Sequence, residues 1–188
     1  AQVDISIYFH FKKIFGREAR ANMIIYITRK FPPSVGGMQR FNAKLTHHLK
    51  NKTSLRVIAW GHSQAFLHFF TIYALIKGIW EGRKKSVQYI YMADGLLAPL
   101  GFLLKKITGK PIVIGIHGRD ITCDIPSYQQ IIPWSLRRLD QIICVSQKSK
   151  QECIARAIPL EKIRVIPNGI DMNDFYIHCS REESRQQI

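Results

Sequence analysis

The sequence has 188 residues, and 46% of them are hydrophobic, which is enough for one well-buried core. The longest apolar stretch, residues 65–80, is interrupted by His68 and Lys77, so we predict no membrane-spanning helix. An early Asp4, with no small-residue cleavage site after a clean apolar segment, argues against a secretory signal.

The charge of the chain is strongly basic and unevenly distributed. The formal net charge is +15, and Glu81 is the only acidic residue between Ala19 and Ala93. Such an excess predicts a polyanionic partner: nucleic acid, an anionic membrane surface or a phosphorylated small molecule. Net charge alone does not distinguish these three.

The cysteines and histidines show no metal-binding pattern. No pair of cysteines has C-x-x-C spacing, and His47 and His48 are adjacent on a predicted helix, so they point in different directions. We therefore expect no bound metal and reduced thiols, as in a cytoplasmic protein. The cysteines are Cys123, Cys144, Cys153 and Cys179.

Short β-branched apolar runs alternate along the chain with longer helical patterns. This alternation predicts an α/β fold, a Rossmann-like parallel sheet with helices on both faces. The expected strands are 23–28, 55–60, 87–92, 111–116, 141–145 and 163–166. The expected helices are 38–49, 64–80, 97–107 (closed by Gly109), 127–139 and 147–157.

The two ends of the chain do not follow this alternation. Residues 1–21 form an N-terminal extension in which 3–9 fit a strand and 11–15 fit a basic amphipathic helix. We assign residues 22–171 to the Rossmann-like domain and 172–188 to a polar tail that is a helix or the start of an interdomain linker.

Polar and glycine residues follow several predicted strands, where ligands of open parallel sheets bind. Arg29, Lys30 and the pair Gly36-Gly37 follow the first strand. Two glycines allow close approach of a ligand, and the amides at a helix N-terminus suit phosphate oxygens. The alternative is that the pair only makes a turn. Neither a dinucleotide fingerprint nor a P-loop is present, which disfavours a dehydrogenase or a P-loop ATPase.

The later strands are followed by ionisable or hydroxyl groups. Asp94 follows the third strand, and His117, Arg119 and Asp120 follow the fourth. The histidine suits a sugar hydroxyl, Arg119 a phosphate, and Asp120 the orientation of either group. Alternatively, Asp120 caps the next helix and Arg119 is solvated. Ser146 follows the fifth strand and suits a helix N-cap.

Three segments taken in order resemble the N-terminal domain of family-4 glycosyltransferases. They are Phe31 to Met38, Gly115 to Asp120, and the region from Ile142 to Asp171 that closes with Ile-Pro-Asn-Gly-Ile-Asp. The resemblance implies one half of a GT-B fold and a retaining transfer of sugar from a nucleotide diphosphate sugar, with no metal and no other cofactor.

The resemblance also implies roles for individual residues. The Gly36-Gly37 loop is similar to the one that closes against donor diphosphate and acceptor, and His117 to the catalytic loop histidine that reaches the reacting sugar. Asp120 matches the acid of the same loop, and from their positions after the strands we expect Asp94, Arg119, Asp120 and Ser146 on the acceptor side. The family's donor site, with two glutamates seven residues apart, lies in a C-terminal domain absent from this sequence, so we expect the fragment to be inactive alone.

Acceptors in this family are often lipid-linked glycans at the cytoplasmic membrane face. A basic domain with apolar helices is then expected to dock on anionic lipid, peripheral to the inner face of the membrane. The alternatives are one half of a GT-B nucleotide-sugar epimerase or phosphorylase, a basic module that binds nucleic acid, and a non-catalytic partner subunit. No nucleic-acid motif supports the second of these.

Overall fold

A computed structural model describes residues 23–168 of the chain, which form a six-stranded, all-parallel sheet. The strand order is β2-β1-β3-β4-β5-β6. The strands are β1 (Met23–Thr28), β2 (Ser54–Ala59), β3 (Val87–Met92), β4 (Ile112–Ile116), β5 (Gln141–Cys144) and β6 (Ile163–Val165).

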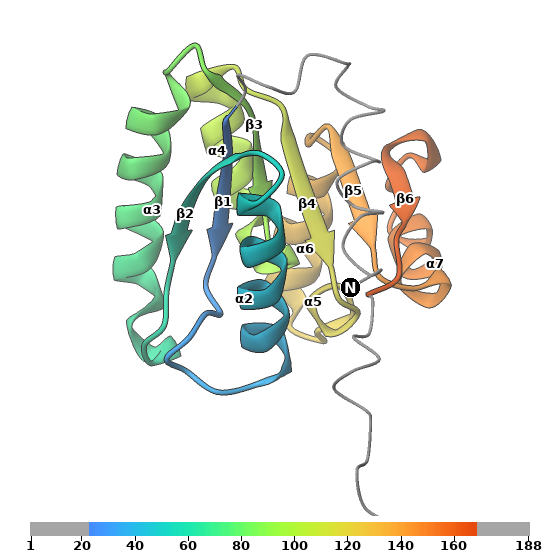
Figure 1. The fold of residues 1–188 in the computed structure, drawn as a ribbon. Helices are drawn as coiled ribbons and strands as arrows, with labels where there is room; N and C mark the ends of the chain where they lie inside the picture. Colours follow the sequence, from blue (N-terminus) through green and yellow to red (C-terminus); the bar gives the residue numbers. More distant parts are fainter. Residues whose placement is uncertain (1–22, 169–188) are drawn as a thin grey trace, which may run out of the picture.

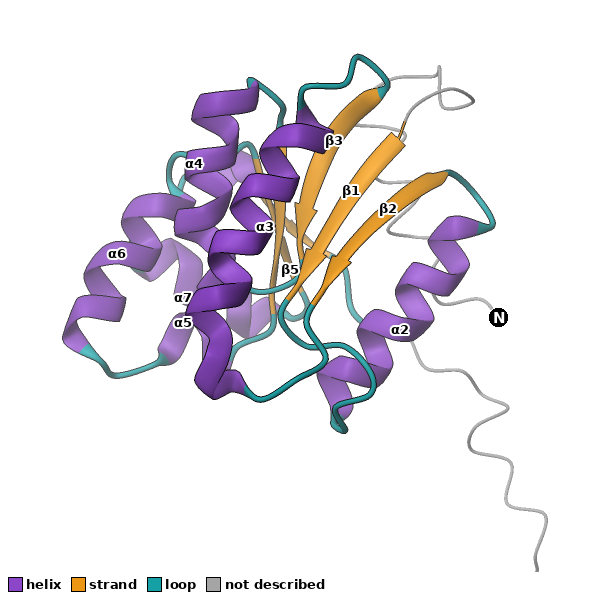
Figure 2. Cartoon of the chain, turned by 90° about the vertical axis from the view of Figure 1, so that its left-hand side faces the viewer, coloured by secondary structure: helices purple, strands orange, loops and turns teal. Residues whose placement is uncertain are grey.

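The helices divide unequally between the two faces of the sheet. Figure 2 shows α2 (Gly37–Lys50) on one side and the remaining helices on the other. The chain reverses its direction of winding at β1, because β2 lies on one side of β1 and β3 on the other (Figure 1). A right-handed crossover then places α2 opposite the later helices. These are α3 (Leu67–Gly82), α4 (Ala98–Thr108), α5 (Arg119–Thr122), α6 (Pro126–Leu136) and α7 (Gln147–Ala155).

Both faces of the central strands are buried, as their unbroken apolar sequences predict. All five residues of β4 are buried, and so are the last five of β1. On the α2 side, Tyr26 stacks on Tyr91 with ring centroids 5.0 Å apart, and its hydroxyl donates to Asn42 Oδ1 of α2 at 2.7 Å. The opposite core is mainly aliphatic and joins the sheet to α3, α4 and α6.

The predicted fold class is confirmed, and β1 and β3 have the predicted bounds. Gly109 ends α4 in the left-handed conformation (φ 67°), as a helix-closing glycine should. The two largest differences from the predicted bounds lie at helix ends. Residues 64–66 form a 3₁₀ turn, η1 (Gln64–Phe66), before α3 begins, and α6 ends at Leu136 rather than at residue 139.

Sequence analysis missed the short elements between the main ones. They are α5 and the 3₁₀ turns η2 (Gly95–Leu97) and η3 (Leu160–Lys162). Each has three or four residues, too few to show an apolar period. The predicted extension 1–21, the segment Gly169–Asp171 and the tail 172–188 lie outside the described residues. Over 23–168, no helix is both long and apolar enough to cross a bilayer.

Candidate functional site

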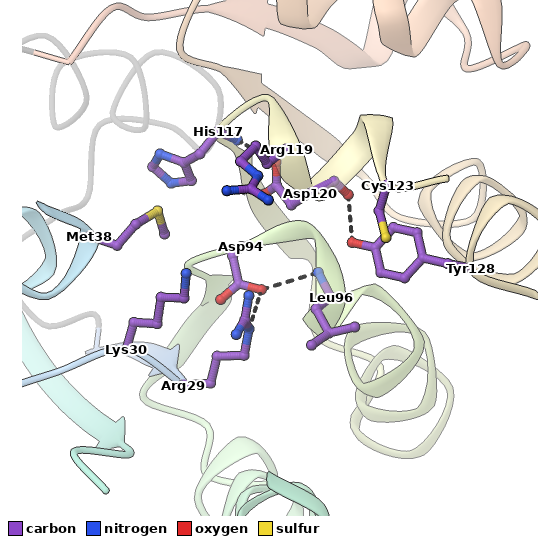
Figure 3. A pocket seen from close by; sticks show the side chains of 10 residues that line it. All are labelled: Arg29, Lys30, Met38, Asp94, Leu96, His117, Arg119, Asp120, Cys123 and Tyr128. Atoms are coloured by element: carbon purple, nitrogen blue, oxygen red, sulfur yellow. Dashed lines mark hydrogen bonds and ion pairs between the residues drawn. The ribbon is translucent and has the colours of Figure 1, made fainter. Parts of the chain in front are cut away.

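A cavity of about 390 Å³ opens at the carboxyl edge of the sheet. It lies where the loops after β1, β3 and β4 meet, beside the point at which the winding reverses, and this is where open α/β sheets bind ligands. Figure 3 shows the ten side chains that line it: Arg29, Lys30, Met38, Asp94, Leu96, His117, Arg119, Asp120, Cys123 and Tyr128.

Asp94 forms the floor of this cavity and is only 1% exposed. Its Oδ1 accepts a hydrogen bond from Arg29 Nε at 3.0 Å and another from the backbone N–H of Leu96 at 3.1 Å. Its Oδ2 is buried and accepts no hydrogen bond within residues 23–168. An unsatisfied buried carboxylate oxygen is costly, so a ligand hydroxyl that donates to Oδ2 would relieve that cost.

Burial raises the pKa of Asp94, and the neighbouring Arg29 offsets this only in part. The same burial raises the pKa of the Tyr128 phenol, which lines the cavity and stays neutral. Burial therefore disfavours the charged form of the Asp94 carboxyl, and a hydrogen bond donated to Oδ2 would stabilise that form.

Asp120 accepts hydrogen bonds from three parts of the site. Its Oδ1 accepts the backbone N–H of His117 at 2.8 Å, and its Oδ2 accepts that of Gly95 at 2.9 Å, so one carboxylate joins the loops after β3 and β4. Its backbone carbonyl accepts the hydroxyl of Tyr128 in α6 at 2.6 Å. The proposed helix cap at Asp120 is wrong, because Gly118 precedes α5 and the Asp120 side chain bonds elsewhere.

Two glycines allow this close packing of loops. A Cβ atom at Gly95 would lie 2.9 Å from the backbone oxygen of Asp120, which no side chain tolerates. Gly118 has φ 96°, a conformation that L side chains rarely adopt. The loops that carry Asp94 and His117 are therefore held at a fixed distance by backbone geometry as well as by Asp120.

The His117 ring is oriented by two neighbours. Its Nε2 lies 3.0 Å from the carbonyl oxygen of Ala93, which only accepts, so Nε2 carries the proton. The ring also meets Phe41 of α2 edge-on, with centroids 5.5 Å apart. In the neutral imidazole Nδ1 is then the acceptor, and no described residue is recorded as its partner. His117 thus offers the cavity a hydrogen-bond acceptor of fixed position.

Lys30 and Arg119 bring positive charge to the cavity. Arg119 is exposed, and within the described part of the chain neither side chain forms a recorded ion pair or hydrogen bond. Arg29 differs from both because it is committed to Asp94. Two uncommitted cations beside a neutral acceptor can bind a phosphate or another anionic group.

The remaining predicted residues lie at the margin of the cavity or away from it. Gly36 and Gly37 stand at the start of α2, next to the lining residue Met38, and neither lines the cavity itself. A Cβ atom at Gly37 would meet nothing within 4 Å, so packing does not require glycine there. Ser146 accepts the backbone N–H of Ser149 at 3.1 Å and caps α7, which confirms the N-cap interpretation.

The rest of the lining, beyond the predicted site residues, consists of Arg29, Lys30, Met38, Leu96, Cys123 and Tyr128. The position of Arg29 and Lys30 directly after β1 was a usable signal for both. Tyr128 gave none, because it reaches the cavity from inside α6. Within residues 23–168, no three His, Cys, Asp or Glu side chains gather closely enough to hold a metal ion. The thiols of Cys123, Cys144 and Cys153 are free.

The comparison with family models matches about half of the chain. Residues 83–174 match the family model described as Glycosyltransferase Family 4, a range that includes Asp94, His117, Arg119 and Asp120 but not Gly36 or Gly37. No curated protein sequence shows significant similarity to the chain.

Solved GT-B structures resemble the fold. The crystal structure of Anabaena Alr3699/HepE in complex with UDP-glucose matches with a TM-score of 0.65 and 18% identity, over 88% of this chain and 49% of that one. The same protein in complex with UDP gives 0.57 and 17%, over 88% and 49%. The apo form of the lipopolysaccharide outer core galactosyltransferase WaaB gives 0.54 and 14%, over 79% and 46%.

At these identities the likeness shows the fold alone. The chain spans about half the length of these structures, so it corresponds to one half of a GT-B architecture. The predicted family and the predicted half-fold are both confirmed at this level.

Proposed function

The chain carries a glycosyltransferase family 4 domain over residues 83–174, and from this we propose that it is the acceptor-side half of a retaining GT-B glycosyltransferase. In the proposed reaction, the bond between the anomeric carbon and the leaving phosphate oxygen breaks. A bond from that carbon to an acceptor oxygen forms, and the proton of the acceptor hydroxyl leaves with the nucleoside diphosphate. No metal and no other cofactor takes part.

One observation carries this proposal: groups suited to a sugar and to a phosphate line the same cavity. Asp94 Oδ2 and His117 Nδ1 are acceptors without a recorded partner in the described chain, and both suit the hydroxyls of a sugar. Lys30 and Arg119 lie in the same lining and suit an anion. A cavity for a nonpolar ligand would not need these four groups together.

We assign the groups as follows. Asp94 accepts a hydroxyl of the acceptor, and His117 accepts a hydroxyl of the reacting sugar. Lys30 and Arg119 hold the phosphate of the donor or of a phosphorylated acceptor. Asp120 is a positioning residue, because each of its carboxylate oxygens accepts a backbone N–H and together they fix the two loops. The Gly36-Gly37 loop closes over the cavity from the start of α2.

The substrates are proposed as chemical classes and not as individual compounds. HepE was crystallised with UDP-glucose, so a UDP-hexose is the first donor to try, with hexosyl transfer as the expected activity. The proposed acceptor is a glycan or a lipid-linked sugar at the cytoplasmic face of the membrane. Donor recognition is proposed to reside mainly in a second GT-B domain, so residues 1–188 alone should be inactive.

The test is a transfer assay on the intact protein that contains this chain. UDP-, GDP- and ADP-hexoses labelled in the sugar are incubated with a membrane extract and with soluble glycans. We expect label in a glycolipid or glycan fraction and release of an equal amount of nucleoside diphosphate. Label converted to an epimer without an acceptor, or sugar 1-phosphate formed with inorganic phosphate, would instead support an epimerase or a phosphorylase.

A further inference from the structure

The outward side of α3 carries a stripe of exposed apolar side chains. With η1, it presents Phe66, Phe69, Tyr73, Ile76 and Trp80, each 48% to 66% exposed. They recur at every third or fourth position, so they lie on one side of the helix. Soluble monomers rarely expose so large a contiguous apolar surface.

The fold does not require this stripe, because α3 packs through its other side. Phe70 and Ala74 are fully buried against the sheet. A Cβ atom at Gly78 would lie 2.9 Å from Leu104 Cδ2, which shows how closely α3 approaches α4. The exposed stripe is additional to the apolar side that the core already uses.

The apolar surface continues over the two neighbouring helices. Leu103 and Ile107 are exposed on α4, and Ile131 and Trp134 on α6. Helix α3 packs on α4 and α4 on α6, in one layer on the same side of the sheet (Figure 2). We call the α3 stripe together with these four residues the outer face.

Cations lie over the aromatic rings of this face. Arg138 lies 3.8 Å from the ring centroid of Trp134, and Lys84 lies 4.5 Å from that of Trp80. Lys77 and Lys106 lie over Tyr73 and Phe102 at 5.5 and 5.9 Å. Such contacts contribute little at exposed sites, but they place positive charge beside Tyr73, Trp80 and Trp134, and beside the neighbouring Phe102.

Negative charge is excluded from the same surface. Glu81 is the only acidic residue within α3, α4 and α6, and its side chain is 1% exposed. It is also neutralised by Lys84 Nζ at 2.7 Å and Arg56 Nε at 3.5 Å. The outer face therefore combines large exposed apolar groups with a row of cations, and the helices α3, α4 and α6 themselves expose no carboxylate.

We propose that the outer face binds the headgroup region of an anionic lipid bilayer. The aromatic and aliphatic side chains enter the interface, and Lys77, Lys106 and Arg138 contact lipid phosphates. A second copy of the chain fits this face poorly, because each copy has a net charge of +15 and would present the same cations. No helix in residues 23–168 spans a bilayer, so the contact is interfacial.

The cavity lies close to the proposed bilayer surface. Tyr128, which lines the cavity, and Trp134, on the outer face, belong to the same helix, and six residues of helix advance about 9 Å. The lipid contact does not depend on the proposed reaction, because it is argued from a surface that shares no residue with the cavity. If both proposals hold, the acceptor is a molecule held in that membrane.

The experiment measures sedimentation of the 188-residue chain with vesicles of phosphatidylcholine alone or with 30% phosphatidylglycerol. We expect binding to the anionic vesicles, at least tenfold weaker binding without phosphatidylglycerol, and weakening with salt. Phe69→Ser with Ile76→Ser should weaken binding at least tenfold. The matched control is Ile154→Ser with Leu160→Ser, two exposed apolar residues of α7 and η3, which should bind as wild type.

Two further measurements complete the test: vesicle binding by charge variants and the fluorescence emission of Trp80. Lys106→Gln with Arg138→Gln should weaken binding about fivefold per cation at low salt, whereas Lys148→Gln on α7 should not. With Trp60→Phe and Trp134→Phe, emission from Trp80 should shift to shorter wavelength on anionic vesicles. Equal binding by the apolar variant and wild type, or an unshifted Trp80, would overturn the proposal.

The two proposals fail in different assays. Loss of lipid binding in the apolar variant, with unchanged transfer to a soluble acceptor, supports the membrane contact whatever the substrate. Vesicle binding that persists while apolar variants abolish self-association, seen by sedimentation velocity, would assign the face to a dimer and overturn the proposal. An intact protein without any transferase activity would refute the proposed reaction and leave the vesicle result standing.

Discussion

The cavity and the outer face use positive charge in different ways. In the cavity, Arg29 is paired with the buried carboxylate of Asp94. Lys30 and Arg119 line the same cavity, and Asp120 joins two of the loops that form it. On the outer face, Arg138 and Lys84 lie over aromatic rings, and the helices α3, α4 and α6 expose no carboxylate of their own. The first arrangement holds a small ligand in one position, and the second suits a fluid surface of many phosphates.

This difference shows that the cations behind the net charge of +15 serve different purposes in different regions of the molecule. The Asp120 carboxylate holds two loops of the cavity through backbone amides, so substitution of Asp120 should change stability as well as activity. The outer-face side chains contact mainly solvent, so substitutions there should change binding and leave stability almost unaltered. The following predictions test this contrast.

The largest expected effect separates two adjacent phenylalanines of α3. Phe70→Ala should lower the free energy of unfolding by about 3–5 kcal/mol, because Phe70 is fully buried in the core. Phe69→Ala should change it by about 0.5 kcal/mol or less, because Phe69 is 58% exposed. Urea denaturation of both variants measures the difference. Equal losses would mean that the outer face is part of the fold.

Asp120→Ala should lower the free energy of unfolding by about 2–4 kcal/mol. The change leaves the backbone N–H groups of His117 and Gly95 without their acceptor, and each such bond to a charged group contributes about 1.5–3 kcal/mol. The control is Asp124→Ala, an exposed acid four residues later. If urea denaturation finds the two variants equally stable, the hydrogen bonds of Asp120 do not hold the two loops together as described.

Glu81→Gln should lower the free energy of unfolding by about 1–3 kcal/mol at pH 7, since it removes the charge that pairs with Lys84. The hydrogen bond from Lys84 lowers the pKa of Glu81 below its ordinary value of 4.5. The stabilisation is therefore present above pH 4.5 and is lost as the pH falls through the lowered folded-state pKa.

Urea denaturation of wild type and Glu81→Gln at pH 7 and in acid measures this dependence. The difference between them should shrink in acid. Exposed Glu161→Gln serves as the control and should show almost no difference at either pH. A difference for Glu81→Gln that is the same at both pH values would mean that packing, not charge, is what the substitution removes.

The sequence predicted the sheet well because buried parallel strands are nearly continuous apolar runs. β1 and β3 kept their predicted bounds, and Gly109 ended its helix as expected. Four of the predicted site residues, Asp94, His117, Arg119 and Asp120, line one cavity, since the carboxyl ends of neighbouring parallel strands meet at one edge.

Prediction was weaker where the signal is not local. Tyr128 reaches the cavity through a hydroxyl bonded to the Asp120 carbonyl, and no pattern within α6 marks it. The hydrogen bond that joins Asp120 to Gly95 spans 25 residues of the chain, so residue type alone predicted a ligand-orienting role or, alternatively, a helix cap, and not this link between loops. The apolar character of residues 64–80 was evident, but only the structure separates buried Phe70 from exposed Phe69.

The most direct test of the central claim is the effect of His117→Ala on sugar transfer by the intact protein. The account predicts a fall in kcat/KM of about 100-fold, or about 2.7 kcal/mol of transition-state stabilisation, with the free energy of unfolding nearly unchanged. His47→Ala on the exposed surface of α2 should match wild type. Unchanged turnover in His117→Ala would contradict the assignment of this cavity as the site of transfer.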